Sequence, residues 1–573
     1  MKIKLVSFII ATTMVFSNFV SCYIPDSSKD IVSSDKTPNV TTSSEDLTDK
    51  NESSDILQSD MEFQTTYPEI FASTLKYTLS DSDTERFDKK LNECEQLFLS
   101  NKKENETKLK KALYELNSIK EFFDAQRNIA QLLYDCDLSD DTAKNNQYTS
   151  DEMYWDIHEK FWAFINSTIT EDNVLEPTVR EFEEKEFPSL LTKEYDASSY
   201  ALQMTQIEND IRKYNRSATY EQAHKLYTQY IYASQMYAKA YGYDNYYDYQ
   251  TDTSYNRDYG KEERELFREY VKKYLVPLYR KYNARSNWID LFLTSKEFAL
   301  SEEYLNNRYD SFSENLLLLY LESLPASTRE CMLEVFEKDR IIIADNDNSF
   351  DSAYIKEIGN TPICYLHENR ANLIDVSHEI GHYYTHSYQG NTDWISFDLR
   401  ETHSQGNTLL MLSYLNKKLD SRAFNSAQAF EISSMLYQTI SSTIRDEFDE
   451  IVFSNPQSQN YSIEQLNQIM EDLIEEYDVS DISKTFTKQL MTYWNRLGTE
   501  QIAYQISYAT SFVTALQIYL KSLNDYNEAV LCYQAIVEQI DKNSTFLKTI
   551  SNAGLLSPLD EKLYEQIIDQ KPF

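Results

Sequence analysis

Two histidines stand four residues apart in the segment His378-Glu379-Ile380-Gly381-His382. Residues four apart in a helix lie on one face, about a turn from each other. Their imidazoles can therefore bind one Zn²⁺ at roughly 2.0–2.1 Å each. Glu379 points part-way round the helix, where its carboxylate can act as a general base on water without binding the metal. The pattern indicates a metal-dependent hydrolytic site. The alternative is a pair of core histidines that bind no metal.

Histidine and glycine are rare in this chain, and both are concentrated around the motif. Five of the seven histidines fall between residues 367 and 403, and four of the eight glycines fall between 359 and 406. Gly381 lies inside the motif, where a glycine costs a helix about 1 kcal/mol relative to alanine. We expect another segment to approach the helix closely at this glycine. A purely structural helical protein leaves this clustering unexplained.

The motif and a segment that follows it resemble a known family. The motif reads HExGH from His378 to His382, and Glu401 is followed three residues later by Ser404. This combination resembles the thimet oligopeptidase and oligoendopeptidase F family of zinc peptidases, in which a glutamate in a Glu-x-x-Ser setting on the next helix is the third ligand. The resemblance implies one Zn²⁺ bound by His378, His382 and Glu401. It extends over about residues 200–573.

A segment near the C-terminus, residues 504–510, is similar to the tyrosine-bearing segment of that family. Tyr504 and Tyr508 are four apart and share one helical face, and the resemblance implies that they stabilise the oxyanion of the tetrahedral intermediate. Because the chain has 45 tyrosines, the alternative is ordinary packing with a solvated hydroxyl. The chain departs from the family where Thr385 replaces a common histidine. It also lacks a histidine just before the tyrosine segment, since His403 is its last.

Three residues compete to be the third ligand. His386 lies eight residues after His378, about 80° further round the helix and two turns along its axis. His403 is two positions from Glu401 and faces another side of the same helix. Tyr388 stands where a metzincin-type site needs its third histidine, which excludes that class. Glu401 is preferred because it completes a His₂Glu set with an open fourth position, and His403 is the next candidate.

Helical periodicity dominates the chain from about residue 63. Apolar residues recur at three- and four-residue steps from Leu109 to Phe123. Ser462 and Gln465 form a capping pattern at the start of an apolar stripe that reaches Tyr477. Further helical stretches are expected at 201–240, 262–283, 313–324, 371–388 and 427–453.

Residues 341–366 break the helical pattern. They contain β-branched and aromatic runs around Gly359-Asn360-Thr361-Pro362, which predicts a strand pair joined by a turn. Such a sheet can offer an edge strand to an extended peptide, and residues 353–363 resemble the family's substrate-binding hairpin. The predicted fold is mostly α: a large helical zincin-type peptidase with a small β element beside the HExxH helix. By resemblance it also has a central channel for short unstructured peptides.

Composition excludes some classes of function. The chain has 573 residues and a net charge of −38, which repels phosphate backbones and makes nucleic-acid binding unfavourable. Only 8 glycines and 11 prolines occur, so helices should be long and turns few. The six cysteines contain no Cys-x-x-Cys pair and indicate neither a disulfide framework nor a cysteine zinc site.

The N-terminus predicts export. Two lysines precede an apolar run that ends at Cys22, and the Val-Ser-Cys ending resembles a bacterial lipobox in which Cys22 is lipidated. Ordinary secretory cleavage is the alternative. We therefore expect a signal peptide at 1–22, a flexible Ser/Thr/Asp-rich tether at 23–61, an N-terminal helical region at 62–200 and a zinc peptidase region at 201–573. The expected location is the extracytoplasmic face of the cell membrane, with attachment by the lipid anchor only.

The expected function is hydrolysis of internal peptide bonds in short, unstructured oligopeptides by a metal-activated water. The competing hypothesis is a catalytically inactive, peptide-binding surface lipoprotein that keeps the peptidase fold. An inactive form is expected to have lost one of the four positions His378, Glu379, His382 and Glu401, and all four are present.

Overall fold

The computed structural model describes most of the chain beyond the N-terminal segment. The described residues are 70–169, 173–186, 198–214, 219–281, 311–390, 392, 394–418, 421–496 and 502–570. The predicted signal peptide, the tether at 23–61 and Cys22 lie outside them. Within these ranges, no helix is both long and apolar enough to cross a membrane.

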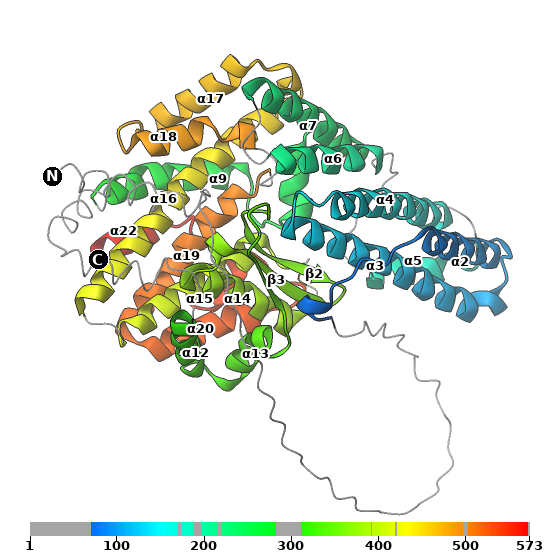
Figure 1. Ribbon diagram of the computed structural model, residues 1–573, viewed down its shortest axis with the longest axis horizontal. Coiled ribbons are helices and arrows are strands. Elements are labelled where there is room, and N and C mark those ends of the chain that lie inside the picture. The colour runs from blue at the N-terminus through cyan, green and yellow to red at the C-terminus, as the bar shows by residue number, and fades with distance from the viewer. Residues whose placement is uncertain are drawn as a thin grey trace, which may run out of the picture.

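Four N-terminal helices pack around a hydrophobic core of their own. They are α2 (Asp81–Leu99), α3 (Glu106–Cys136), α4 (Asp141–Ile169) and α5 (Glu176–Glu186). The apolar stripe predicted between Leu109 and Phe123 is buried on α3, because α2 and α4 pack against that helix. In Figure 1 these helices form an arm at one side of the molecule, and α3 reaches from it to the sheet.

The sheet has three strands in the order β1-β3-β2. The strands are β1 (Ile341–Ala344), β2 (Ala353–Ile358) and β3 (Thr361–His367). The predicted hairpin is confirmed: β2 and β3 are antiparallel, and Gly359 turns between them with φ of +59°. The sequence did not predict the third strand, β1, which pairs parallel to β3 along its other edge. As a result β3 is the central strand and is buried along its whole length.

Between the arm and the sheet, the chain forms further helices, which pack into the same core as the helices that follow the sheet. They are α6 (Ser198–Tyr214), α7 (Tyr220–Ala240), α8 (Tyr246–Tyr249), α9 (Lys261–Tyr270), α12 (Ser311–Glu322) and α13 (Ala326–Glu337). π-helical segments occur at Gln250–Ser254 and Val271–Leu275. The predicted boundary at residue 200 falls inside α6, and the domain division stays a prediction.

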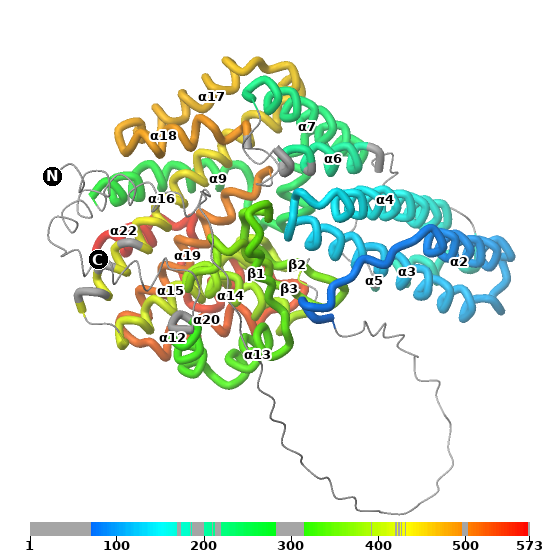
Figure 2. The backbone as a smooth tube through the Cα atoms, viewed as in Figure 1, coloured from blue at the N-terminus to red at the C-terminus, as the bar shows by residue number. Residues whose placement is uncertain are grey.

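The helices after the sheet build the largest core. They are α14 (Leu373–Gln389), α15 (Phe397–Leu415), α16 (Ser421–Phe453), α17 (Ile463–Glu476), α18 (Lys484–Met491), α19 (Gln505–Asn524), α20 (Tyr526–Glu538), α21 (Phe546–Asn552) and α22 (Glu561–Asp569). The capping box predicted at Ser462 and Gln465 is present at the start of α17. Helix α14 packs against β3 and α15, and α15 packs against α19; Figure 2 shows these elements close together in the interior of the fold. Every residue of α15 from Glu401 to Leu415 is buried.

Short 3₁₀ turns join several of these elements. They are Ala72–Thr74, Lys103–Asn105, Glu368–Arg370, Ser458–Asn460 and Trp494–Arg496. The turn at Glu368–Arg370 matters for the site, because it connects the buried end of β3 to α14. The mostly α fold with a small sheet beside the motif helix, predicted from the sequence, is therefore confirmed.

Candidate active site

Helix α14 carries the HExGH motif and has defined ends. Asn372 caps its start, where the side-chain oxygen accepts a hydrogen bond of 2.9 Å from the backbone N–H of Asp375. It ends at Gly390, whose positive φ of +71° glycine adopts without strain because it has no Cβ atom. Between these ends, His378 and His382 lie one turn apart, with their rings edge to face and their centroids 5.0 Å apart.

Helix α15 brings Glu401 to the two histidines, and a glycine permits its close approach. A Cβ atom at Gly381 would lie 2.6 Å from the Cα atom of Ser404 and 3.0 Å from the carbonyl oxygen of His403. The expected close approach to Gly381 is therefore present, and the approaching segment is the backbone of α15. Because Glu401 lies three residues before Ser404, this contact places its carboxylate beside the histidine face of α14.

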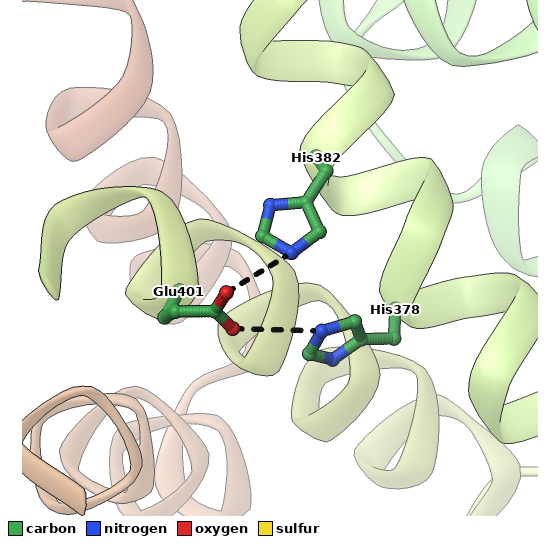
Figure 3. Close-up of side chains that lie close together, drawn as sticks. All are labelled: His378, His382 and Glu401. Atoms are coloured by element: carbon green, nitrogen blue, oxygen red, sulfur yellow. Dashed lines mark ion pairs between the residues drawn. The ribbon is translucent and has the colours of Figure 1, made fainter. Parts of the chain in front are cut away.

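The two imidazoles and the carboxylate converge on one point. Glu401 Oε2 lies 3.6 Å from His378 Nε2, and Glu401 Oε1 lies 3.5 Å from His382 Nε2. Figure 3 shows both Nε2 atoms directed at the carboxylate from the neighbouring helix. One ligand atom from each residue lies within 4.8 Å of the other two. This spacing suits three ligands around a single metal ion.

Glu379 supplies a separate carboxylate beside this cluster. It is 5% exposed, and its Oε2 atom is buried with no hydrogen-bond partner among the described residues. A buried carboxylate oxygen without a partner is costly, and a bound water or a nearby cation would relieve that cost. The unpaired oxygen and the His₂Glu donor set both fit a hydrated metal ion held between α14 and α15.

Burial and the neighbouring charges set the pKa values at the cluster. Burial raises the pKa of Glu379 to about 8. The charge of His378 acts against this shift, and the charges of Glu401 and Asp375 add to it. A divalent cation would favour the ionised form of Glu379 and lower this pKa. Burial also opposes ionisation of Glu401, but the charges of His382 and His378 and the hydroxyl of Tyr504 outweigh it and hold its pKa at about 2.

The two cluster histidines differ in their preferred charge. Burial lowers the pKa of His382 to about 3, because the charge of Glu401 only partly offsets it. For His378 burial acts in the same direction, but the hydrogen bond and charge of Glu401 overcome it and raise the pKa. His382 is therefore held as the neutral imidazole that metal binding requires.

The other candidate ligands lie elsewhere. His386 pairs through Nδ1 with Glu357 of β2, and Thr392 Oγ1 lies 3.1 Å from the same nitrogen. His403 is fully buried, with Nδ1 2.7 Å from Thr385 Oγ1 and Nε2 2.7 Å from the carbonyl oxygen of Ile536. Both rings are engaged away from the cluster. Thr385, which stands where the family commonly has a histidine, thus serves as the partner of His403.

Tyr504 and Tyr508 differ in their relation to the cluster. The Tyr504 hydroxyl donates a hydrogen bond of 2.5 Å to Glu401 Oε1. Tyr508 packs edge-on against Tyr504, with ring centroids 4.7 Å apart, and its backbone carbonyl accepts a bond of 3.3 Å from Gln405 Nε2. The helical spacing predicted for the pair is present at the start of α19. Tyr504 touches the cluster directly.

Sequence reasoning missed a buried ion pair that supports this arrangement. Arg257 and Asp398 have side chains with 0% exposure, and Arg257 Nε lies 3.4 Å from Asp398 Oδ2. Asp398 stands one helical turn before Glu401 and also accepts a bond of 2.6 Å from the hydroxyl of Tyr259. No spacing in the sequence connects residues 257 and 398.

Comparisons with known proteins agree with the fold. No family model matches the sequence, and no curated protein sequence matches it. A crystal structure described as an oligoendopeptidase F from Bacillus anthracis str. Ames is similar to this chain. Its TM-score is 0.66, with 17% sequence identity over 87% of this chain and 97% of that one. A second structure described as oligoendopeptidase F has a TM-score of 0.68 and 14% identity over 87% and 97% of the two chains.

A structure of PZ peptidase A with an inhibitor is also similar. Its TM-score is 0.60, with 16% identity over 87% of this chain and 98% of that one. At such identities the likeness establishes the fold, which is that of the oligoendopeptidase F type of peptidase. The resemblance inferred from HExGH and Glu-x-x-Ser is thus confirmed at the level of the fold.

Proposed function

We propose that the chain is a zinc metallopeptidase in which His378, His382 and Glu401 bind one Zn²⁺. The observation that carries this proposal is the convergence of two imidazole nitrogens and one carboxylate within 4.8 Å of one another. The peptidase fold of the structural neighbours supports it. Three protein ligands of this type leave a fourth position open for water or substrate, as in known catalytic zinc sites.

Bound at this cluster, Zn²⁺ would lower the pKa of a water in its open position and polarise a substrate carbonyl. Side chains of the protein carry out proton transfer and stabilise the oxyanion. Glu379 accepts the proton of the attacking water on its free Oε2 atom and passes it to the leaving amine. The tyrosine hydroxyls donate to the oxyanion that develops on the peptide carbonyl.

The roles of the two tyrosines follow from their contacts. In the described state, the proton of the Tyr504 hydroxyl is engaged by Glu401, so Tyr504 orients that carboxylate. Donation to an oxyanion requires the hydroxyl to leave Glu401, or requires Tyr508 to supply the bond. Replacing each tyrosine by phenylalanine separates these roles, because loss of an oxyanion donor costs about 10²–10³ in kcat while loss of ligand orientation also weakens zinc binding.

Two measurements on the purified protein test the proposal together. Zinc content is measured after dialysis against trace zinc, and cleavage of a quenched peptide is followed with and without a chelator. One zinc per chain and chelator-sensitive cleavage support the proposal. One zinc per chain with peptide binding but no cleavage favours the inactive peptide-binding protein. A chain that binds no zinc contradicts the metal site.

We propose that the substrates are short, flexible peptides, since the motif lies in a mostly buried helix deep in the chain. Peptides of about five to twenty residues, the size implied by the resemblance, should be cut while folded proteins survive. Digestion of a folded protein at a comparable rate would contradict this.

The proposed location is the outer face of a membrane, with attachment through a lipid on Cys22.

A further inference from the structure

A non-glycine residue in the left-handed conformation stands immediately before Tyr504. Ala503 has φ of +61°, a region in which an L-residue with a Cβ atom is strained. Such a conformation persists only where the surrounding contacts impose it. Ala503 is fully buried and lies in the turn of residues 502–504 from which α19 starts. Its conformation therefore sets the direction in which Tyr504 and Tyr508 leave the backbone.

Two side chains from one distant segment hold this turn. The Tyr255 hydroxyl donates a hydrogen bond of 2.9 Å to the carbonyl oxygen of Ile502. Arg257 Nη2 donates a bond of 2.5 Å to the carbonyl oxygen of Ala503. The guanidinium also lies over the Tyr255 ring, 4.7 Å from its centroid. Consecutive carbonyl groups of the strained turn are thus fixed by residues about 250 positions earlier.

The same guanidinium reaches both helices of the site. Arg257 Nη2 donates a bond of 2.9 Å to Ser507 Oγ on α19, and Nε faces Asp398 Oδ2 on α15. Asp398 in turn accepts hydrogen bonds from Ser507, at 3.3 Å, and from Thr510. Arginine can serve these acceptors at once because its donors are held in a rigid fork. The first turn of α19 is thereby fixed to the first turn of α15.

The fixed turns carry the residues of the proposed site. Glu401 lies one helical turn after Asp398, and Tyr504 directly follows Ala503. The hydroxyl of Tyr504 reaches Glu401 Oε1 at 2.5 Å, and its ring packs on Phe397 with centroids 4.9 Å apart. A rotation of the turn at Ala503 would withdraw this hydroxyl from the carboxylate.

We propose that Arg257 is a positioning residue: by holding the left-handed turn at Ala503 against α15, it aims Tyr504 and Tyr508 at the His378–His382–Glu401 cluster. The effect on catalysis rests on the proposed function, whereas the effect on the turn does not. Arg257 touches neither the cluster nor Glu379 through any described hydrogen bond or ion pair, so it acts through the tyrosines.

The test compares R257M with R264M in the full chain. Arg264 is the matched control, because it also forms a buried ion pair, with Nη2 3.0 Å from Glu450 Oε1, but does so between α9 and α16. Hydrogen exchange of residues 502–512 is measured first, since it needs neither metal nor substrate. We expect R257M to exchange about tenfold faster in this segment, and R264M to leave it unchanged. Adding A503G to R257M removes the backbone strain at this position. The double variant should therefore regain part of the protection against hydrogen exchange that R257M loses.

Catalysis supplies the second readout. In R257M we expect zinc affinity to fall by about 10–100-fold, because Tyr504 no longer orients Glu401. At saturating zinc we expect kcat lower by about 10²-fold and KM within about threefold of the parent value, as for lost transition-state donors. Tyr508→Phe should lower kcat by a smaller factor in R257M than in the parent protein. The reason is that the Tyr508 hydroxyl is already displaced in R257M, so its removal has less effect. Equal exchange in R257M and the parent, or equal acceleration in R264M, would overturn the positioning role. Fully additive effects of R257M and Tyr508→Phe would do the same.

Two outcomes remain separable. If R257M does not fold, R257K is measured instead. Its amine can pair with Asp398 but cannot also donate hydrogen bonds to the Ala503 carbonyl and Ser507. Hydrogen exchange of residues 502–512 as slow as in the parent would then refute the proposal. If the parent protein binds no zinc and cuts no peptide, the proposed function fails. The exchange comparison still decides whether Arg257 holds the turn.

Discussion

Gly381 and Ser404 bring two helix backbones into contact at the centre of the molecule. A Cβ atom at Gly381 would lie only 2.6 Å from the Cα atom of Ser404, closer than such atoms approach in folded proteins. The contact lies one residue before His382 on α14 and three residues after Glu401 on α15. The distance between the proposed ligands thus depends on a missing side chain.

Replacing Gly381 by alanine should push α14 and α15 apart. Overpacking of this kind costs about 1–3 kcal/mol of stability, and the outward shift should weaken zinc binding at the same time. Gly260→Ala is the control, because a Cβ there meets only Glu263 Oε2 at 3.3 Å. Thermal unfolding and zinc titration of both variants check the prediction. Equal stability and zinc affinity in G381A and the parent would show that the helices can yield without cost.

Replacing Glu379 by glutamine should abolish cleavage and leave zinc bound. The amide cannot accept the proton of water, and the loss of a general base lowers kcat by about 10²–10⁴-fold. Glu431→Gln is the matched control. It is also a buried glutamate whose pKa burial raises to about 8, and it lies on α16 within range of the charges of Asp375 and His378. It therefore shows whether neutralising any buried carboxylate near the cluster is enough to lower kcat. Zinc content and kcat are measured for both. More than trace activity in E379Q would show that another group is the base.

Replacing Cys22 by alanine tests the proposed membrane attachment. Without its thiol the residue cannot be acylated, so the protein should leave the membrane fraction or accumulate unprocessed. Fractionation and mass spectrometry of the N-terminus distinguish these results. Cys94→Ala is the control, since that thiol is buried in the core of the N-terminal arm. Membrane association equal to that of the parent would refute lipidation.

The local elements of the site could be predicted from the sequence for a physical reason. A 3.6-residue period places His378 and His382 on one face, and the short connection after Gly390 returns α15 against α14. The hairpin of β2 and β3 follows from a turn at Gly359. These are interactions between residues close in the chain, where spacing determines geometry.

The supporting contacts could not be predicted, because they join distant segments. Arg257 contacts Asp398 and Ala503 across separations of 141 and 246 residues. The parallel pairing of β1 with β3 likewise depends on a connection that passes through β2. Thr385 and His403 pair across two helices. A pattern along the chain carries no signal for such contacts.

His158 should make the arm sensitive to acid. It lies among the rings of Trp155 and Trp162, and its Nδ1 atom is buried with no hydrogen-bond partner in the described part of the chain. Burial, reinforced by the charges of Lys120 and Arg127, lowers its pKa from 6.5 to about 3. Below pH 6.5, His158 is therefore protonated in the unfolded chain, whereas in the folded chain it stays neutral until about pH 3. Its cost to stability is absent above pH 6.5 and grows as the pH falls towards 3.

Replacing His158 by phenylalanine should remove this dependence. Between pH 6 and 4, the parent should lose up to about 1.4 kcal/mol per pH unit more than the variant, because only the parent has this group to protonate on unfolding. Urea unfolding at pH 7.5, 5.5 and 4.5 measures the difference. Other titrating groups are common to both proteins and cancel in the comparison. Parallel curves would show that His158 is not held neutral.

Replacing Glu401 by alanine should remove zinc and activity together. The residue supplies the carboxylate that lies 3.5–3.6 Å from both Nε2 atoms. Loss of a supporting contact to a ligand costs about 10–100-fold in metal affinity, so loss of the ligand itself should cost more than about 100-fold. The two histidines considered as alternative ligands are already engaged: His386 by Glu357, and His403 by Thr385 and Ile536. Neither is free to take its place.

The same geometry defines the controls. His386→Ala and His403→Ala should both keep one zinc per chain, although His403→Ala should lose stability because its buried ring leaves a cavity and an unpaired carbonyl group at Ile536. Zinc content measured by mass spectrometry, beside thermal unfolding, separates loss of metal from loss of fold. A folded E401A protein with stoichiometric zinc would overturn the ligand assignment. Because His403 lies on the same helix two residues away, it would then become the leading candidate for the third ligand.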